Sequence, residues 1–383
     1  MTISEKLRQI DQTLIQLLNE RISILAASGT PTIQEQFSSY RSLLLQAGVP
    51  ESTWNSIVVG CMSALASEPS LQHRIEPRNI TVVGGRGAMG CFFTDRLSAL
   101  GHQVSVLEHD DWDKADVLLG TADLVLICVP LKATLAVIRK VAQYLPPTAI
   151  LADIASTKAD AVQAMLENHS GPVVGLHPMF GPGVNSFMGQ KVVVCPGRCP
   201  DACQWLLDSL EADGGNLITC SPEEHDRMMV AVQAIRFFSN FSLGTFLAQE
   251  GIDIGRSLEF ASPLYRTEIN TISRLLAQDA ALYVDILLAS KERCEAIRRF
   301  VGTGDRLATL LAEGDRAALI AEFESARESF REEAARSLKE SNYVINHLST
   351  FLAASEIETA PMKRSPVSSA LSTMGWCPNR NDF

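Results

Sequence analysis

The sequence predicts an α/β Rossmann-like domain, preceded by a short helical segment and followed by an all-α domain. Strand-like apolar runs alternate with helix-like segments between residues 78 and 221, and from residue 222 onward the pattern is entirely helical. A glycine-rich turn lies between the first strand and the first helix of the alternating region. The domains expected are therefore 1–76, 78–221 and 222–352, with 355–383 as a mobile tail.

The first segment has the pattern of an amphipathic helix. Its apolar residues recur at spacings of three and four, at Ile3, Leu7, Ile10, Leu14, Leu17 and Ile24. The same stripe contains Arg21. A guanidinium on a buried face needs a partner or an anionic ligand, whereas near a helix end it can also reach solvent. Two further helices are expected at about 34–46 and 51–67, and a polar linker at 69–77.

The alternating region contains a series of strand candidates. They are residues 80–83, 103–107, 124–129, 149–154, 173–176, 191–194 and 217–219. Their near-continuous valine, isoleucine and leucine content is typical of a parallel sheet that helices cover on both faces.

The turn after the first of these strands is Gly85-Arg86-Gly87-Ala88-Met89-Gly90. Strand, glycine turn, helix, second strand and acid follow one another here as in a dinucleotide-binding site. We expect Gly85 to allow the tight turn, Gly87 to let backbone N–H groups approach a pyrophosphate, and Gly90 to let the helix pack on the sheet. The N-terminus of the helix then faces the anion.

Glu108 ends the second strand, where an acid holds a ribose 2′-hydroxyl. Its carboxylate repels a 2′-phosphate, so NAD is favoured over NADP, although Arg86 offers the opposite charge. The expected cofactor-binding residues are Gly85, Arg86, Gly87, Ala88, Met89, Gly90, Glu108 and Pro130. A tight turn that binds nothing is the alternative.

The helical region contains a segment, 228–247, that is apolar on nearly every face. A helix of this kind lies in the centre of a core or between two subunits, so we expect a homodimer through this domain. Further helices are expected at 264–276, 281–299, 306–311 and 316–352.

The composition is that of an ordinary globular protein, with 46% hydrophobic and 20% charged residues. The net charge of −11 argues against nucleic acid or an anionic membrane as a partner. We expect no signal peptide and no membrane span, and therefore a cytoplasmic location with reduced cysteines. Cys195, Cys199 and Cys203 recur every four residues, but prolines interrupt the run and no histidine lies nearby, so we expect no metal.

Three polar segments fall where open α/β sheets place their active sites, at the carboxyl ends of strands. Residues 153–158 follow the fourth strand, 175–182 follow the fifth, and 262–266 must fold over from the helical region. His177 precedes a proline and glycine turn that would aim its ring as a general base. A structural histidine bonded to backbone is the alternative.

Three further polar residues are candidates for the same site. Lys158 and Arg266 would serve an anionic substrate, or they are surface charges. His225 would join the site, or it is a polar residue in the first turn of a helix.

These segments resemble the prephenate dehydrogenase family, and in particular its bifunctional members with a chorismate mutase domain. The resemblance covers about 78–345. It is carried by the runs 82–90 (VVGGRGAMG), 107–113 (LEHDDWD), 155–158 (ASTK), 175–182 (GLHPMFGP), 224–226 (EHD) and 262–266 (SPLYR). It implies that the chain oxidises prephenate with NAD⁺ and loses CO2, giving 4-hydroxyphenylpyruvate, in the tyrosine branch of aromatic amino acid biosynthesis.

The resemblance also implies roles for single residues. His177 matches the catalytic histidine, which accepts the proton of the ring hydroxyl, and Ser156 hydrogen-bonds near that hydroxyl and the nicotinamide. Arg266 pairs with a substrate carboxylate, while Lys158 and His225 line the anionic pocket. The protein then mostly orients the reactants and removes a proton, because the restored aromatic ring drives the loss of CO2.

The chain departs from the family at two places. Phe237 stands where the long form often has histidine, which weighs against feedback sensing of tyrosine. Ser4 replaces an arginine of the mutase site, and the chain is shortened at 29–32, where a lysine is expected, although Arg21 remains. A mutase that binds a dianion needs several cations, so we expect this domain to be degenerate and used for packing or association.

Other functions stay open on the sequence. Arogenate differs from prephenate by an amine in place of the side-chain ketone, and no residue decides between the two. The β-hydroxyacid dehydrogenases also join a dinucleotide domain to helices, but they use a lysine where this chain has Glu223, Glu224 and Asp226. An NAD-binding scaffold without catalysis is the non-enzymatic alternative.

Overall fold

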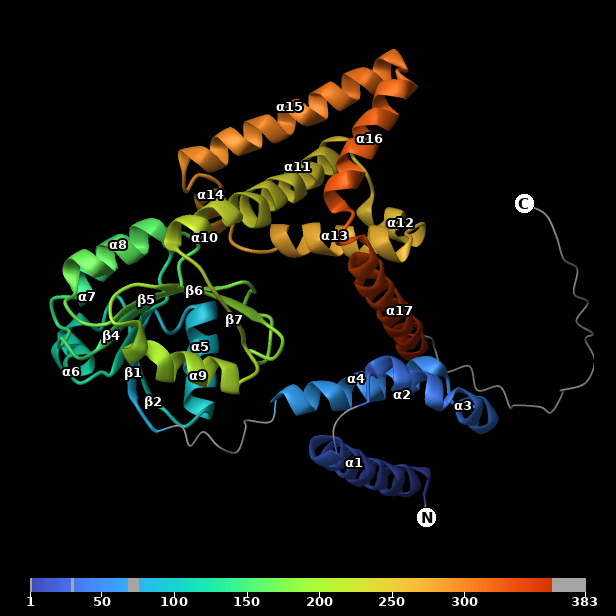
Figure 1. The fold of residues 1–383 in the computed structure, drawn as a ribbon, viewed down its shortest axis with the longest axis horizontal. Coiled ribbons are helices and arrows are strands. Elements are labelled where there is room, and N and C mark those ends of the chain that lie inside the picture. The colour runs from blue at the N-terminus through green and yellow to red at the C-terminus, as the bar shows by residue number, and fades with distance from the viewer. Residues whose placement is uncertain (1, 29–30, 68–75, 360–383) are drawn as a thin grey trace, which may run out of the picture. The chain divides into compact units, whose positions relative to one another are not determined.

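The structure, a computed structural model, describes residues 2–28, 31–67 and 76–359. The chain forms two compact units that divide between Ser329 and Phe330. The first unit contains N-terminal helices, an α/β sheet domain and a set of further helices (Figure 1). None of the helices in these described ranges is both long and apolar enough to cross a membrane.

The N-terminal part is helical, as expected. Its helices are α1 (Ile3–Ser28), α2 (Ile33–Ser39), α3 (Arg41–Ala47) and α4 (Glu51–Ser67). The single helix expected at 34–46 is therefore two, which meet at Tyr40. The apolar stripe of α1 is largely exposed in the single chain, where Leu7 is 57% exposed.

The sheet has seven strands in the order β2-β1-β3-β4-β5-β6-β7. The strands are β1 (Asn79–Val83), β2 (Gln103–Leu107), β3 (Leu124–Ile127), β4 (Ile150–Asp153), β5 (Val173–Pro178), β6 (Lys191–Pro196) and β7 (Asn216–Thr219). The pairs from β2 to β5 are parallel, as expected, but β6 is antiparallel to β5. The sheet is therefore mixed, because residues 179–190 form no crossover helix that would return the chain to the starting edge.

Helices cover both faces of the sheet, as the strand composition predicted. They are α5 (Ala88–Ala99), α6 (Ala115–Gly120), α7 (Leu131–Val141), α8 (Ala159–Asn168) and α9 (Gln204–Ala212). One core contains Phe93 of α5 and Leu206 of α9, and the other contains Ile138 of α7 and Met165 of α8. The loops that follow the carboxyl ends of β1, β4 and β5 carry the glycine turn and two of the polar segments singled out by the sequence.

The helical part that follows is less regular than expected. It contains α10 (Pro222–Met229), α11 (Arg236–Gln249), α12 (Ile254–Glu259), α13 (Pro263–Leu276), α14 (Ala280–Leu287), α15 (Lys291–Glu313) and α16 (Arg316–Phe330). A π-helical segment, Val230–Ile235, joins α10 to α11 inside the stretch expected to be one apolar helix. The sequence did not predict α12, and it predicted a single helix at 281–299, where Ser290 caps the start of α15.

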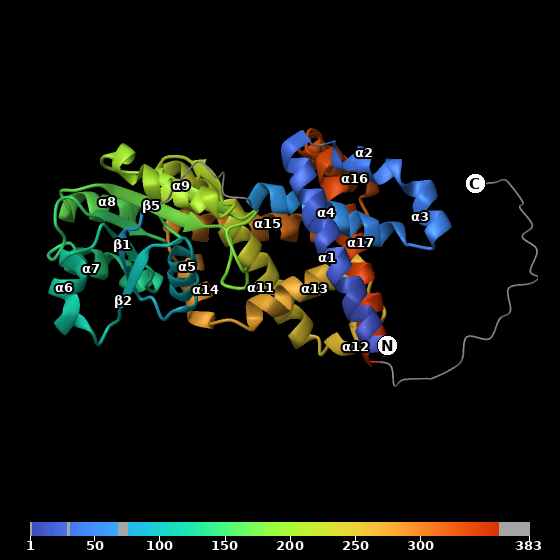
Figure 2. The ribbon, with the colours of Figure 1, turned by 90° about the horizontal axis from the view of Figure 1, so that it is seen from below.

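Helices α11 and α13 lie side by side (Figures 1 and 2). Gly244 permits this contact, because a Cβ there would lie 2.9 Å from Ile272 Cγ2 and 3.0 Å from Leu276 Cδ1. In the second unit, α17 (Ala334–Thr359) runs beyond residue 352 into the expected tail. The rest of that tail lies outside the described residues.

Candidate active site

The glycine turn between β1 and α5 is built without room for side chains. Gly84 has a φ of +82°, and a Cβ there would lie 2.6 Å from the Cys128 carbonyl oxygen. The left-handed residue is therefore Gly84 and not Gly85, where an added Cβ would instead lie 2.6 Å from Val106 Cγ2. A Cβ at Gly90 would lie 2.2 Å from the Gly84 carbonyl oxygen, so the helix packs on the turn as expected.

The first turn of α5 is open to an anion. Gly87 occupies the N-cap position and has no side chain to accept the free N–H groups of Ala88 and Met89. A diphosphate would satisfy these donors and the positive end of the helix dipole. Pro130 is at the N-cap position of α7, two residues after the Cys128 carbonyl that contacts the glycine turn. The residues present thus fit a dinucleotide.

Acidic residues surround the other side of this turn. The Arg86 backbone N–H donates to Glu108 Oε1 at 2.6 Å. The Arg86 guanidinium lies 3.8 Å from Asp111, and the neighbouring Lys114 lowers the pKa of that carboxyl. Asp111, which sequence reasoning missed, therefore reduces the charge that Arg86 offers to a 2′-phosphate. This arrangement favours NAD⁺.

A chain of hydrogen bonds reaches His177 at the end of β5. Its Nδ1 lies 2.7 Å from Nε2 of His225 in α10, and His225 Nδ1 lies 2.8 Å from Asp226 Oδ1. The Asp226 carboxylate also accepts the backbone N–H groups of Lys158, at 2.9 Å, and Ala159, at 3.0 Å. These bonds join two of the three segments that the sequence predicted to meet, 153–158 and 175–182, and they add Asp226, to which the sequence assigned no role.

The chain of bonds fixes the tautomer of each ring. A carboxylate only accepts hydrogen bonds, so His225 donates from Nδ1, and in its neutral form it presents an unprotonated Nε2. His177 then donates from Nδ1, which leaves its own Nε2 without a proton. Burial, with His225, Lys158 and Arg293 nearby, holds the pKa of His177 well below its usual range. His177 is therefore a neutral base at neutral pH.

Lys158 does not line an anionic pocket, contrary to the expectation. Its side chain is fully buried, and its Nζ donates to Asp153 Oδ2 at 2.6 Å and to the Leu176 carbonyl at 2.7 Å. This pair ties the end of β4 to β5, so Lys158 acts on the site by holding the loop that carries Ser156. The Ser156 side chain is partly exposed on that loop.

Arg266 lies near the start of α13 and is half-buried. Its Nη2 donates to the Leu258 carbonyl at 2.9 Å, which fixes the end of α12. Arg274, two turns further along the same helix, is exposed and has no ion-pair partner among the described residues. Its Nη2 lies 2.8 Å from the place a Cβ would take at Gly183, in the loop that follows His177. Arg274 thus presents a guanidinium next to the loop that follows His177.

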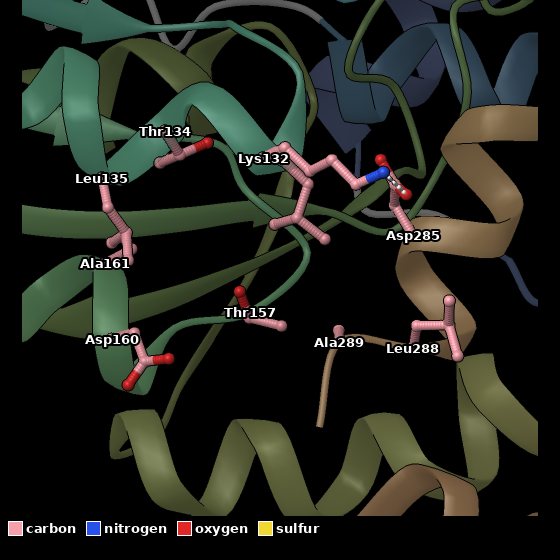
Figure 3. Close-up of a pocket in the computed structure, with 10 residues that line it drawn as sticks. Lys132, Thr134, Leu135, Thr157, Asp160, Ala161, Asp285, Leu288 and Ala289 are labelled. Atoms are coloured by element: carbon pink, nitrogen blue, oxygen red, sulfur yellow. Dashed lines mark ion pairs between the residues drawn. The ribbon is translucent and has the colours of Figure 1, made fainter. Parts of the chain in front are cut away.

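A pocket of about 270 Å³ opens at the boundary between the sheet domain and the helices (Figure 3). Its walls are the first turns of α7 and α8, the Thr157 side of the Ser156 loop, and α14. Lys132 and Asp285 join across it at 2.6 Å. The pocket is therefore at the carboxyl edge of the sheet, beside Pro130 and Ser156.

No metal site accompanies these features in the described part of the chain. Among those residues, no group of three histidine, cysteine or acidic side chains is placed to hold an ion. Cys195 and Cys203 are buried and Cys199 is exposed.

The fold and the site together define a dehydrogenase that uses a nicotinamide dinucleotide and carries a helical second domain. Residues 102–219 match the family description "Prephenate dehydrogenase, nucleotide-binding domain", and residues 221–325 match "Prephenate dehydrogenase, dimerization domain". The T-protein of Enterobacter agglomerans is 35% identical over 359 residues, which cover 90% of this chain and 96% of that protein. The chain belongs to the prephenate dehydrogenase family.

Two other relatives agree with this assignment. The T-protein of Haemophilus influenzae is 32% identical over 359 residues, covering 90% of this chain and 95% of that protein. The fold is that of prephenate dehydrogenase from A. aeolicus in complex with hydroxyphenyl propionate and NAD⁺, with a TM-score of 0.55 and 20% identity. That match covers 68% of this chain and 99% of the other. The expected fold class is confirmed.

Proposed function

We propose that this chain oxidises prephenate with NAD⁺ and releases CO2, giving 4-hydroxyphenylpyruvate. The observation that carries the proposal is the bonded series Asp226–His225–His177, which presents an unprotonated Nε2 at the carboxyl edge of the sheet. His177 Nε2 would accept the proton of the ring hydroxyl. Bound NAD⁺ supplies the hydride acceptor. Loss of the ring carboxylate as CO2 then leaves its electron pair to the aromatic ring.

The other residues of the site bind and orient the substrate. Arg274 would hold one carboxylate by two parallel N–H donors, beside Gly183. Ser156 would donate to the hydroxyl oxygen of the ring from the loop that Lys158 fixes to β5. The Asp226 carboxylate stabilises the positive charge that His177 gains with the proton and shares with His225.

One assay with two substrates tests this proposal. Purified protein is given NAD⁺ and either prephenate or arogenate, and NADH formation is measured. We expect turnover with prephenate to have the higher kcat/KM. Preference for arogenate would change the substrate and keep the mechanism, since both share the ring hydroxyl and carboxylate. NAD⁺ binding without turnover of either compound would make the chain a scaffold and overturn the proposal.

We also propose that the N-terminal helices do not act as a chorismate mutase. Arg21, the remaining cation of the expected site, donates from Nη2 to Gln36 Oε1 and lies 5.3 Å from the ring centroid of Trp54. Its Nη1 is buried without a partner. Arg21 is the one cation of the expected site that the sequence retains, and a dianionic transition state needs several. Chorismate should therefore persist with the full chain in the absence of NAD⁺. Turnover near one per second, typical of a working enzyme, would contradict this.

The helical part should form a homodimer. The match of residues 221–325 to a dimerization domain supports this. So do large apolar side chains on α15 and α16, because Leu311 is 67% exposed and Phe323 is 64% exposed in the single chain. Light scattering of the purified chain tests the proposal, and a monomer at micromolar concentration would contradict it.

A further inference from the structure

Arg293 is a buried cation in the first turn of α15 that neither the sequence nor the proposed mechanism used. It is 2% exposed and belongs to the largest fully buried side chains of the described residues. Its Nη1 donates to the Ile286 carbonyl at 2.7 Å and to Gln233 Oε1 at 3.3 Å. Its Nη2 donates to the Ser156 carbonyl at 3.1 Å. One guanidinium therefore joins α14, the π-helical segment and the catalytic loop.

The three acceptors of this guanidinium are neutral. None of the ion pairs among the described residues involves Arg293, and its nearest negative influence is the Asp226 carboxylate. A buried cation loses its hydration, and neutral oxygens replace only part of it. A neutral amide donor would satisfy the same carbonyls at a lower desolvation cost. Hydrogen bonding alone therefore does not explain why a charged side chain is buried at this position.

Two local features of the backbone place the Arg293 guanidinium next to the catalytic loop. The π-helical segment Val230–Ile235 places Gln233 inward, and such segments are frequent at functional sites. Helix α15 begins beside α14 (Figure 1), where the Ser290 hydroxyl accepts the Arg293 backbone N–H at 3.2 Å. The orientation of Arg293 is thus fixed by hydrogen bonds at its backbone N–H and at its guanidinium.

We propose that Arg293 is a positioning residue that holds the Ser156 peptide in place, and that its charge, which has no ion-pair partner among the described residues, draws a substrate carrying two carboxylates into the site. The inference rests on the proposed function and deepens it, because it names the source of the preference for a dianion. Arg293 acts through Ser156 and through the electrostatic potential at His177. The other titratable or charged groups that act on His177 are Lys158 of the catalytic loop and His225 and Asp226 of α10.

Two substitutions separate the charge from the hydrogen-bonding geometry. Arg293→Met removes both, whereas Arg293→Lys keeps the charge and loses the planar set of donors. Lys291→Met is the matched control, because Lys291 lies in the same helical turn, is exposed, and only pairs with Glu295 at 3.6 Å. Each protein is checked for its thermal midpoint and its NAD⁺ dissociation constant. The readouts are kcat and KM on prephenate, their pH profiles, and the affinity for hydroxyphenyl propionate with NAD⁺ present.

Arg293→Met should lower kcat/KM about 10- to 100-fold, which corresponds to the loss of one charged hydrogen bond. It should also lower the affinity for hydroxyphenyl propionate about tenfold. It should also move the acid limb of the kcat/KM profile to higher pH, because a positive neighbour of His177 is gone. Arg293→Lys should leave that limb in place while kcat falls. Lys291→Met should match the wild type in every readout.

A purely structural role predicts a different result. Both Arg293 variants would then lose thermal stability, while the folded fraction kept the wild-type pH limb and the wild-type affinity for the probe. That outcome overturns the inference and leaves the proposed function standing. A wild-type protein that turns over neither ring substrate and does not bind the probe overturns both proposals.

Discussion

Replacing His177 by asparagine tests the proposed base with little disturbance of the fold. The amide of asparagine can reproduce the donor at Nδ1, so the 2.7 Å bond to His225 has a substitute. Nothing in asparagine replaces Nε2, which is the atom that accepts the proton. The substitution therefore removes the chemistry and keeps the contact.

The magnitudes of the two effects are far apart. A lost general base costs about 10²- to 10⁴-fold in kcat, equivalent to roughly 3–5 kcal/mol in the barrier. An imperfect substitute for one hydrogen bond costs about 0.5–1.5 kcal/mol in the free energy of unfolding. A large fall in kcat with a small change in thermal midpoint is thus the expected signature.

The assay compares NADH formation, thermal midpoint and NAD⁺ affinity for His177→Asn and for a control, His102→Asn. His102 is also buried, and its Nε2 lies 3.3 Å from Ser209 Oγ, at the opposite end of the strands from the site. The control should keep its kcat. A His177→Asn protein with kcat within about threefold of the wild type would refute the reasoning, since a lost base costs far more.

Three more predictions concern binding and pH. Arg274→Ala should raise the KM for prephenate about tenfold or more, with the KM for NAD⁺ unchanged. Arg266→Ala should raise the KM for prephenate less, and a larger increase in Arg266→Ala than in Arg274→Ala would make Arg266 the carboxylate ligand. The kcat/KM with NAD⁺ should exceed that with NADP⁺, and Glu108→Ser should lower the ratio of the two values. A ratio that stays unchanged in this variant would show that Glu108 does not determine the cofactor preference. Because His177 must be neutral and burial lowers its pKa, kcat/KM should fall only below about pH 6.5; an acid limb above neutrality would contradict this.

The lowered pKa of His177 also predicts how the stability of the fold depends on pH. The pKa of His177 is lowered in the folded state, so below about pH 6.5 the unfolded chain binds a proton that the folded chain refuses. Burial lowers the pKa of His102 and His169 in the same direction. The free energy of unfolding should therefore fall as the pH drops from 7 to about 5. A denaturant midpoint that does not change over this range would contradict the sign.

Local patterns in the sequence predicted most of the fold and part of the site. Apolar runs and glycine turns depend on neighbours in the chain, so β2 was predicted to the residue, and the glycine turn and His177 were found at strand ends. The reversal of β6 was not predicted, because its composition suits either direction. Gly84 was passed over in favour of Gly85, because only the approach of Cys128 shows which glycine needs a positive φ.

The charged residues of the site were harder to predict, because their roles depend on partners far away in the sequence. Lys158 was taken for a surface or pocket charge, yet its amine is enclosed by Asp153 and Leu176. Arg293 lies 137 residues from the Ser156 carbonyl that it contacts. No local pattern reports contacts of this kind, so the cations that shape the site become visible only in three dimensions.

The cap of α8 has a consequence for how this enzyme can be divided. Helix α8 has no capping side chain of its own, and the Asp226 carboxylate, from beyond the end of the sheet domain, accepts the N–H groups of Lys158 and Ala159. The same carboxylate orients the base. A fragment ending before α10 would keep the cofactor turn but have a frayed helix and a freely rotating His177. We therefore expect that the two halves are not interchangeable modules, and that a graft between relatives would have to carry Asp226 together with the helix that it caps.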